Sequence, residues 1–470
     1  MIDHGFVAAP PPAALAEVAA LKPAPTTTDG KVRDLRALPW TSIDNPESRD
    51  LDQVEATEKV DGGVRLYVGI ADVGSFVPRG SATDQLAGQN TTSVYTGVRT
   101  FPMLPERLSF DLTSLLANQV RWAVIFETLV HDDGSISDGK LYPALIENHA
   151  KLDYPSISLW LDGKSGPPPG LVNQPTLQEQ VRAQDQLSQL LSDTRKKHGA
   201  LDFDTAETRP VVDASGEVTG LVAHQQDRAG RIIEELMVVS NRTVAGALDA
   251  AGFASIRRVV KTPERWLKIV AYAAERGAKL PTEASSIALS GFIDKMRAER
   301  PNEFGEISVS LVKLMGRGEY VGHRPGTEEI GHFGLATDQY THSTAPNRRY
   351  VDLITQRLIQ SLNRKEATPY NFDQLAQIAT HCSEREAEEQ KVERRVQKSA
   401  AAMLLQNRVG EVFDSLVTGA SVKGTYVRVS HPTVEGKVVR GDHGLKVGDK
   451  VRVKLCDISV EKGFIDFEVV

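Results

Sequence analysis

Residues 42–53 read Ser-Ile-Asp-Asn-Pro-Glu-Ser-Arg-Asp-Leu-Asp-Gln. Asp50 and Asp52 are two residues apart, so in an extended chain their carboxylates leave the same face. Asn45-Pro46 favours a turn that returns Asp44 toward them. Three converging carboxylates repel one another unless a hard cation neutralises them, which predicts a Mg²⁺ site. The same spacing is also typical of an Asx-rich turn that caps a strand, whereas the Gly and Glu spacing of an EF-hand is missing.

Length and composition limit the class of protein. The chain has 470 residues, 40% hydrophobic and 25% charged, as in globular proteins of about three folding units. Its net charge of −7 predicts that any nucleic acid binds in a local groove. Cys382 and Cys456 lie too far apart for a zinc motif. No apolar run reaches a membrane span, and the N-terminus does not resemble a signal peptide, so we expect a cytoplasmic protein without a membrane partner.

Hydrophobic periodicity predicts an α+β fold with a C-terminal barrel of the OB type. The pattern favours strands at 64–71, 122–130, 138–147, 450–455 and 464–469, and helices at 12–21, 231–251, 350–363 and 384–397. The charge-dense helix at 384–397 should be solvated or face something polar. We expect an N-terminal extension with a short helix and linker at 1–35, a large body at 36–405 and a five-stranded barrel at 406–470.

An ordered set of blocks surrounds the acidic stretch. The blocks are Ile43-Asp44, Asp50-Leu51-Asp52, Ile70-Ala71-Asp72-Val73, Ser93-Val94-Tyr95, 102–109 (PMLPERLS), 232–237 (IIEELM), 340–353 (YTHSTAPNRRYVDL) and Val392-Glu393-Arg394. In this order, over residues 36–405, they resemble the catalytic domain of the RNase II/RNase R (RNB) family. The C-terminal barrel resembles the S1 RNA-binding domain that follows it in that family. One block alone is weak evidence, but the ordered set is highly specific.

The resemblance implies a processive 3′→5′ exoribonuclease that hydrolyses RNA to nucleoside 5′-monophosphates. It implies a two-ion mechanism with Mg²⁺, or Mn²⁺ as a substitute, in which one ion activates a water and the other steadies the leaving oxygen. The implied metal ligands are Asp44, Asp50, Asp52 and Gln53, with Asp50 and Asp52 also catalytic. Gln53 departs from the family, which usually has a fourth acid there. Its amide oxygen can bind a metal but brings no charge.

By the same resemblance, Arg348 is the catalytic arginine that stabilises charge on the phosphate. Without the resemblance, Arg348-Arg349 would be interpreted as an ordinary solvated pair. The motif is altered, with Ala345 where Ser is usual and Asn347 where an apolar residue is usual. We expect Arg348 at a helix start, and Asp352, four residues on, to orient it.

The family's RNA-contacting positions also have counterparts. Tyr95 and Phe203 match aromatic side chains that clamp bases, although either ring alone would more often be a core residue. Tyr154 and Glu234 match residues that contact ribose, and only one of Glu234 and Glu235 can face a channel. The remaining implied contacts are Arg349 and Glu393, and Glu393 could equally be a solvated helix residue.

The expected partner is the single-stranded 3′ end of an RNA bound by a monomer. In the barrel, a binding face is expected around Lys423, Tyr426, Arg428, His431, Lys437 and Arg440. Relatives carry two cold-shock barrels before the catalytic domain, and residues 1–35 are too short for one. We therefore expect a short form with an open channel mouth that tolerates structured RNA. The alternatives are a non-catalytic RNA-binding relative, suggested by Gln53, and a metal-dependent endoribonuclease, suggested by the acids alone.

Overall fold

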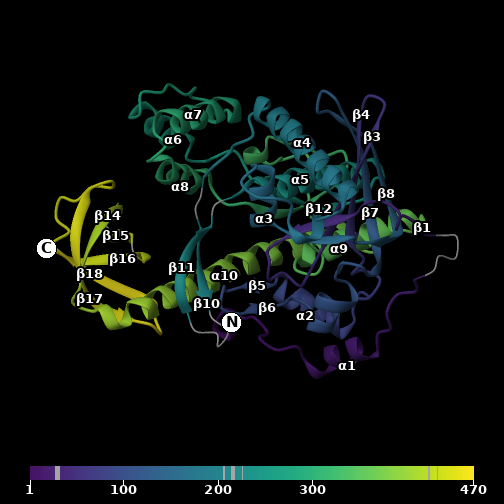
Figure 1. The fold of residues 1–470 in the computed structure, drawn as a ribbon, viewed down its shortest axis with the longest axis horizontal. Helices are drawn as coiled ribbons and strands as arrows, with labels where there is room; N and C mark the ends of the chain where they lie inside the picture. Colours follow the sequence, from purple (N-terminus) through teal and green to yellow (C-terminus); the bar gives the residue numbers. More distant parts are fainter. Residues whose placement is uncertain (27–31, 205–206, 213–217, 225, 422–423, 431) are drawn as a thin grey trace.

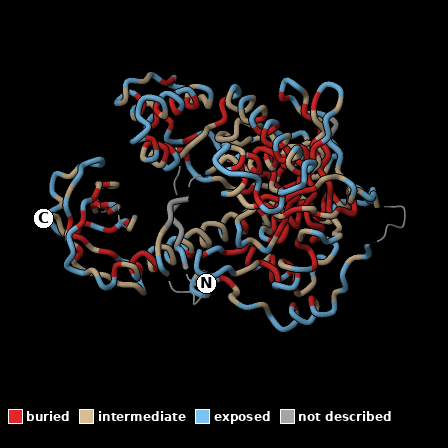
Figure 2. The backbone as a smooth tube through the Cα atoms, in the orientation of Figure 1, coloured by how far each residue is buried: buried red, intermediate tan, exposed pale blue. Residues whose placement is uncertain are grey.

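A large α/β body and a small β-barrel lie at the two ends of one long helix (Figure 1). A computed structural model describes residues 1–26, 32–204, 207–212, 218–224, 226–421, 424–430 and 432–470. The buried residues concentrate around the central sheet of the body and inside the barrel (Figure 2). This arrangement confirms the predicted α+β fold with a C-terminal five-stranded barrel.

The body is built on a seven-stranded sheet whose interior strands run antiparallel. In spatial order the strands are β1 (Arg33–Asp34), β8 (Ile136–Glu147), β7 (Val120–His131), β4 (Gly63–Ala71), β3 (Gln53–Val60), β2 (Thr41–Asp44) and β9 (Ala150–Asp153). The first half of β3 is buried on both faces, although its residues alternate between polar and apolar. Gln53 and Glu55 are therefore held in the interior, opposite Ile70 and Val68 of β4.

Helices cover the sheet and fill the body. They are α1 (Pro12–Ala20), α2 (Ala82–Asn90), α3 (Tyr154–Leu161), α4 (Pro175–Lys197), α5 (Arg228–Ala250), α6 (Trp266–Ala274), α7 (Ser286–Glu299), α8 (Phe304–Met315), α9 (Tyr350–Arg364) and α10 (Phe372–Leu405). α4 packs against β3, and α5 packs against β7 and β8. α6, α7 and α8 enclose a separate apolar cluster at one side of the body (Figure 1). In the described residues, no helix is long and apolar enough to cross a membrane.

Short elements complete the body. Three two-stranded antiparallel sheets are β5 (Val94–Tyr95) with β6 (Thr100–Phe101), β10 (Glu207–Val212) with β11 (Val218–His224), and β12 (Ser255–Val259) with β13 (Glu319–His323). The segment that carries α6, α7 and α8 lies between β12 and β13 in the chain. The short helical turns are η1 (Ile2–His4), η2 (Leu108–Leu112), η3 (Pro169–Leu171), η4 (Phe333–Leu335) and η5 (Gln406–Arg408). α1 is fixed to the body because the Glu17 carboxylate accepts hydrogen bonds from the N–H groups of Ala82 and Thr83, at 2.7 and 2.8 Å. Glu17 thereby satisfies donors at the start of α2.

α10 connects the body to the barrel. It starts at a capping box, in which the Asn371 and Gln374 side chains each bond the other residue's N–H. Near its end, Ala402 and Leu405 join the barrel core. The closed barrel has the order β14 (Val412–Ser421), β15 (Gly424–Ser430), β16 (Thr433–Arg440), β18 (Phe464–Val469) and β17 (Lys450–Ser459). The last strand lies where it was predicted, whereas α10 extends well beyond the predicted 384–397 at both ends.

Candidate active site

The acid-bearing loop leaves the sheet at Asp44, the last residue of β2, and returns at Gln53, the first of β3. Lys151 of β9 clamps the turn by donating to the carbonyls of Pro46 and Ser48, at 2.9 and 2.6 Å. Ser114 holds the other end, because its hydroxyl accepts from Leu51 N–H at 3.0 Å. The loop is thus fixed by groups outside it, so its acids project from a rigid support.

Asp52 is the most enclosed of the three acids, with 1% of its surface exposed. Its Oδ1 accepts from the N–H of Asn347 at 3.0 Å, and its Oδ2 lies 3.4 Å from Nε of Arg348. Oδ2 is buried and has no hydrogen-bond partner within the described chain. Burial raises the pKa of Asp52 to about 7, and Arg348 opposes that shift.

Asp44 faces Gln53, whose Nε2 lies 3.4 Å from Asp44 Oδ1. Its second oxygen is buried and also lacks a partner among the described residues. Burial raises the pKa of Asp44 to about 7, whereas Arg348 lowers it. Asp44 and Asp52 are therefore two desolvated acids whose charge is only partly compensated by one arginine.

Asp50 is linked to Tyr95, whose hydroxyl donates to Asp50 Oδ2 at 2.6 Å. The N–H of Tyr95 donates to the Glu393 carboxylate of α10 at 3.2 Å. Burial and the neighbouring acids raise the pKa of Tyr95, so the phenol stays protonated and acts as a donor. β5, the acidic loop and α10 therefore meet at Tyr95.

The donor set suits a divalent cation. Asp44 and Asp52 each present one oxygen without a partner, and carboxylate and amide oxygens are the ligands that Mg²⁺ prefers. Among the described residues, Asp44, Asp50 and Asp52 do not bring one oxygen each within 4.8 Å of both others.

Arg348 and Arg349 have different partners. Arg348 lies beside Asp52 with 46% of its side chain exposed, so its guanidinium is open to a ligand. Arg349 is the N-cap of α9 and donates to both oxygens of Asp352, at 2.7 and 2.8 Å. The prediction that Asp352 orients Arg348 is wrong. α9 begins at Tyr350, after both arginines, and the bidentate pair goes to Arg349.

A cavity of about 230 Å³ opens beside these residues. Tyr95, Arg348 and Arg349 line it together with Glu386 and Glu389 of α10. Burial and the neighbouring Glu393 raise the pKa of Glu389 to about 9. The charged face of α10 thus looks onto a polar cavity, as the sequence suggested.

Phe203 and Glu234 share a second cavity, of about 210 Å³. Arg195 of α4 holds Glu235 at 2.5 and 2.8 Å and reaches Glu234 at 3.4 Å. Both glutamates line this cavity, with Glu235 buried and Glu234 the more exposed. Tyr154 lies elsewhere, near Asp44 and Arg348, whose charges act on its hydroxyl.

Glu55 is a further acid near the site that the sequence did not indicate. It is fully buried, and neither carboxylate oxygen has a hydrogen-bond partner among the described residues. Burial raises the pKa of Glu55 well above its usual range, and Asp44 raises it further. In the sequence, Gln53-Val54-Glu55-Ala56 looks like a strand with a polar, solvated face. The local sequence does not indicate that Glu55 is buried, because its burial depends on the packing of α4 against β3.

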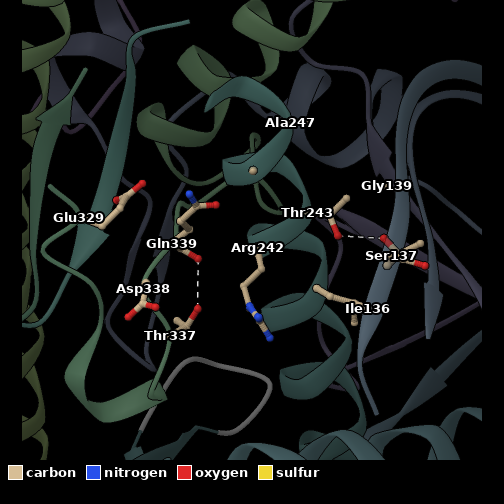
Figure 3. Close-up of a pocket in the computed structure, with 12 residues that line it drawn as sticks. Ile136, Ser137, Gly139, Arg242, Thr243, Ala247, Glu329, Thr337, Asp338 and Gln339 are labelled. Atoms are coloured by element: carbon tan, nitrogen blue, oxygen red, sulfur yellow. Dashed lines mark hydrogen bonds between the residues drawn. The ribbon is translucent and has the colours of Figure 1, made fainter. Parts of the chain in front are cut away.

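Two other features lie apart from the acidic loop. A cavity of about 530 Å³ is lined by Arg242 of α5 and by Thr337, Asp338 and Gln339, and none of the predicted site residues lines it (Figure 3). Asp249, His323 and Glu329 bring possible metal ligands within 4.8 Å of one another. The buried guanidinium of Arg257 lies 3.2 Å from Glu329 and 3.7 Å from Asp249 and already supplies a positive charge.

The barrel residues predicted to bind RNA are partly described. Tyr426 of β15 pairs directly with Lys437 of β16, and Arg428 pairs with Glu435 beside them. These side chains alternate with the buried Val427 and Val429, so they share the outer face of the barrel. Arg440 is exposed at the end of β16. Lys423 and His431 lie outside the described residues.

Buried acids beside an exposed arginine are typical of hydrolases that act on phosphodiesters. Residues 32–365 match the RNB domain, and residues 411–470 match the C-terminal S1 domain of RNase II-type exonucleases. The chain therefore belongs to the RNB family.

Known members of the family support this assignment. Ribonuclease R 1 of Lactococcus lactis is 30% identical over 461 residues, covering 91% of this chain and 55% of the relative. Ribonuclease R of Aquifex aeolicus is 30% identical over 468 residues, covering 93% of this chain and 65% of the relative. The chain thus spans 55–65% of the length of these relatives.

Solved structures agree in fold. Mycoplasma genitalium RNase R in complex with ribose-methylated single-stranded RNA superposes with a TM-score of 0.89 at 26% identity, covering 100% of this chain and 77% of that one. The same Mycoplasma genitalium protein in complex with double-stranded RNA gives a TM-score of 0.87 at 26% identity, covering 100% of this chain and 82% of that one.

Proposed function

We propose that this protein is a processive 3′→5′ exoribonuclease that hydrolyses RNA to nucleoside 5′-monophosphates with two divalent ions, preferably Mg²⁺ with Mn²⁺ as a substitute. The observation that carries the proposal is Asp52, buried with one free oxygen, between the N–H of Asn347 and the exposed Arg348. This arrangement suits a hydrolase that places a phosphodiester between bound cations and an arginine.

The residues of the chain have separate roles in the proposed reaction. Asp44, Asp50 and Asp52 hold the ions, with the Gln53 amide oxygen as an uncharged ligand. The bound ions supply an activated water and neutralise charge on the leaving oxygen. The water adds to the last phosphodiester, the bond to the 3′ oxygen breaks, and the released nucleotide keeps its 5′ phosphate. Arg348 donates paired hydrogen bonds to the phosphate oxygens as their charge grows.

RNA contacts are proposed along a path that leads away from this centre. Tyr95 stacks on a base near the centre, and Phe203 stacks on another in the cavity that it shares with Glu234. Tyr154 and Glu234 contact 2′-hydroxyl groups, since a hydroxyl can donate to one partner and accept from another. Arg349 and Glu393 complete the set of proposed RNA contacts. The protein is proposed to act as a monomer.

We also propose that paired RNA is accepted when it carries a single-stranded 3′ tail. The related RNase R from Mycoplasma genitalium has been solved with double-stranded RNA, and its fold matches all of this chain. Incubation with a 3′-tailed duplex, labelled at the 5′ end of the tailed strand, should shorten that strand to lengths below that of the duplex. A ladder that stops at the junction would contradict this part of the proposal.

A non-catalytic RNA-binding protein is the second candidate, because Gln53 removes a charge from the metal site. An assay with 5′-end-labelled linear RNA and a circular RNA, with Mg²⁺ or with EDTA, separates the functions. The exonuclease shortens the linear RNA from its 3′ end only with Mg²⁺ and leaves the circle intact. Retained binding without shortening would support the non-catalytic protein, and cleavage of the circle would indicate an endoribonuclease.

A further inference from the structure

Glu55 lies two residues beyond Gln53 on the same strand. Both side chains leave the same face of β3, with their Cα atoms about 7 Å apart. Gln53 occupies the position where the family resemblance leads one to expect a fourth acid, so the loop is one negative charge short. Glu55 restores one carboxylate to this face of the strand.

The surroundings of Glu55 are unusual for a buried acid. Neither of its oxygens has a hydrogen-bond partner in the described part of the chain, and no ion pair to it is found there. The nearby Gln184 amide donates to the Glu55 carbonyl at 3.2 Å and to the Thr41 hydroxyl at 3.3 Å. Burying an acid without a partner is unfavourable unless something neutralises it.

A second acid, Asp44, lies on the adjacent strand β2. Glu55 pairs with Thr41 of β2 in the sheet, and Asp44 ends the same strand three residues later. Asp44 also raises the pKa of Glu55. Asp44 also has a buried oxygen without a partner. Gln53, on the same face of β3 as Glu55, donates to Asp44 Oδ1 at 3.4 Å, so this face of the strand leads toward Asp44.

We propose that Glu55 supplies the fourth carboxylate of the metal site and binds the divalent ion together with Asp44. It thereby takes the place of the acid that is missing at position 53. The inference rests on the proposed function, in which this loop binds divalent ions.

The test measures Mn²⁺ binding to the RNA-free protein by electron paramagnetic resonance of the free ion. Glu55→Gln keeps the size of the side chain and removes its charge, and we expect Mn²⁺ binding to weaken about tenfold or more. Glu58→Gln is the matched control, since Glu58 is exposed on the same strand. Its affinity should stay within about twofold of the parent. Unchanged binding by Glu55→Gln, in a protein with the parent's circular dichroism, would overturn the inference.

A second variant, Gln53→Asp, tests whether Glu55 compensates for the missing acid at position 53. If Glu55 already supplies the fourth charge, Gln53→Asp in the parent should strengthen Mn²⁺ binding by less than about threefold, but should restore most of the affinity lost in Glu55→Gln. A gain of about tenfold in the parent, or equal gains in both backgrounds, would overturn the inference. Because no RNA is cleaved in this experiment, its outcome is separate from that of the nuclease assay.

Discussion

At the residue scale, Asp52 is held by groups that come from far along the chain. The N–H of Asn347 donates to one oxygen, and Arg348 lies beside the other. The segment before α9 therefore fixes the position of the acid and also supplies the proposed phosphate ligand. Changing Asp52 should affect chemistry more than binding, because the stacking residues lie elsewhere.

Asp52→Asn should reduce hydrolysis by about 10³-fold or more, because an amide cannot carry the charge that a metal ligand needs. RNA affinity should stay within a few-fold of the parent. Single-turnover cleavage and fluorescence anisotropy on the same RNA measure the two quantities. Hydrolysis at the parental rate would remove Asp52 from its assigned role.

The pKa values of Asp44 and Asp52 predict how the stability of the metal-free protein depends on pH. Both are raised to about 7, whereas an unfolded aspartate ionises near 3.9. Between about pH 4 and pH 7 the folded state thus holds protons that the unfolded state releases, so stability falls as the pH rises. Melting curves in EDTA from pH 4 to pH 8 should show a smaller decline for Asp52→Asn. Parallel curves for parent and variant would contradict the shift assigned to Asp52.

Tyr95→Ala should change the length of the final short product, because the ring is the proposed stacking platform next to the centre. Tyr95→Phe keeps the ring and removes only the hydrogen bond to Asp50, so its end product should match that of the parent. Denaturing gels of exhaustive digests measure both. An identical end product from Tyr95→Ala would show that another group sets the limit.

At the scale of elements, α2 and α9 are joined through a buried ion pair. Asp84 of α2 lies 2.8 Å from the Arg357 guanidinium of α9, and both are nearly inaccessible to water. Asp84 also accepts from Gly80 N–H at 2.7 Å and from the Tyr350 hydroxyl at 3.1 Å. Because α9 directly follows Arg348 and Arg349, the Asp84–Arg357 ion pair helps to fix the position of these two arginines.

Asp84→Asn should lower the free energy of unfolding by about 3–5 kcal/mol, since it leaves a buried arginine without its counter-charge. Glu366→Gln is the control: its pair with Arg364 is 4.0 Å long and exposed, so we expect a loss under about 0.5 kcal/mol. Urea unfolding followed by tryptophan fluorescence compares them. Equal losses in the two variants would mean that the buried pair does not stabilise the junction.

The elements were largely predictable where one face of a strand or helix is buried. Apolar and polar side chains alternate from Ile465 to Val469, and β18 forms at the predicted residues, Phe464–Val469. The prediction for α10 covered only its charge-dense middle. Its two ends carry the buried apolar side chains, with Leu375 and Ala379 in the core of the body and Ala402 and Leu405 in the core of the barrel. The predicted partner of Asp352, Arg348, was wrong because the prediction started the helix two residues before the observed start at Tyr350.

At the scale of the whole molecule, the site is assembled from segments that are far apart in sequence. The acidic loop, β5, the start of α9 and the middle of α10 meet around Tyr95, Asp50 and Glu393. The acids of residues 44–52 were predictable because they are local and dense in sequence. Glu55 was not, because its role depends on α4 covering β3 and on the closeness of Asp44.

The central claim is that these acids bind divalent ions and hydrolyse RNA from its 3′ end. Thin-layer chromatography of products from a uniformly labelled single-stranded RNA tests it most directly, with Mg²⁺ and with EDTA. The account predicts nucleoside 5′-monophosphates from the earliest time points with Mg²⁺, and intact RNA with EDTA. Products that form equally well in EDTA, or that carry 3′ phosphates, would contradict it.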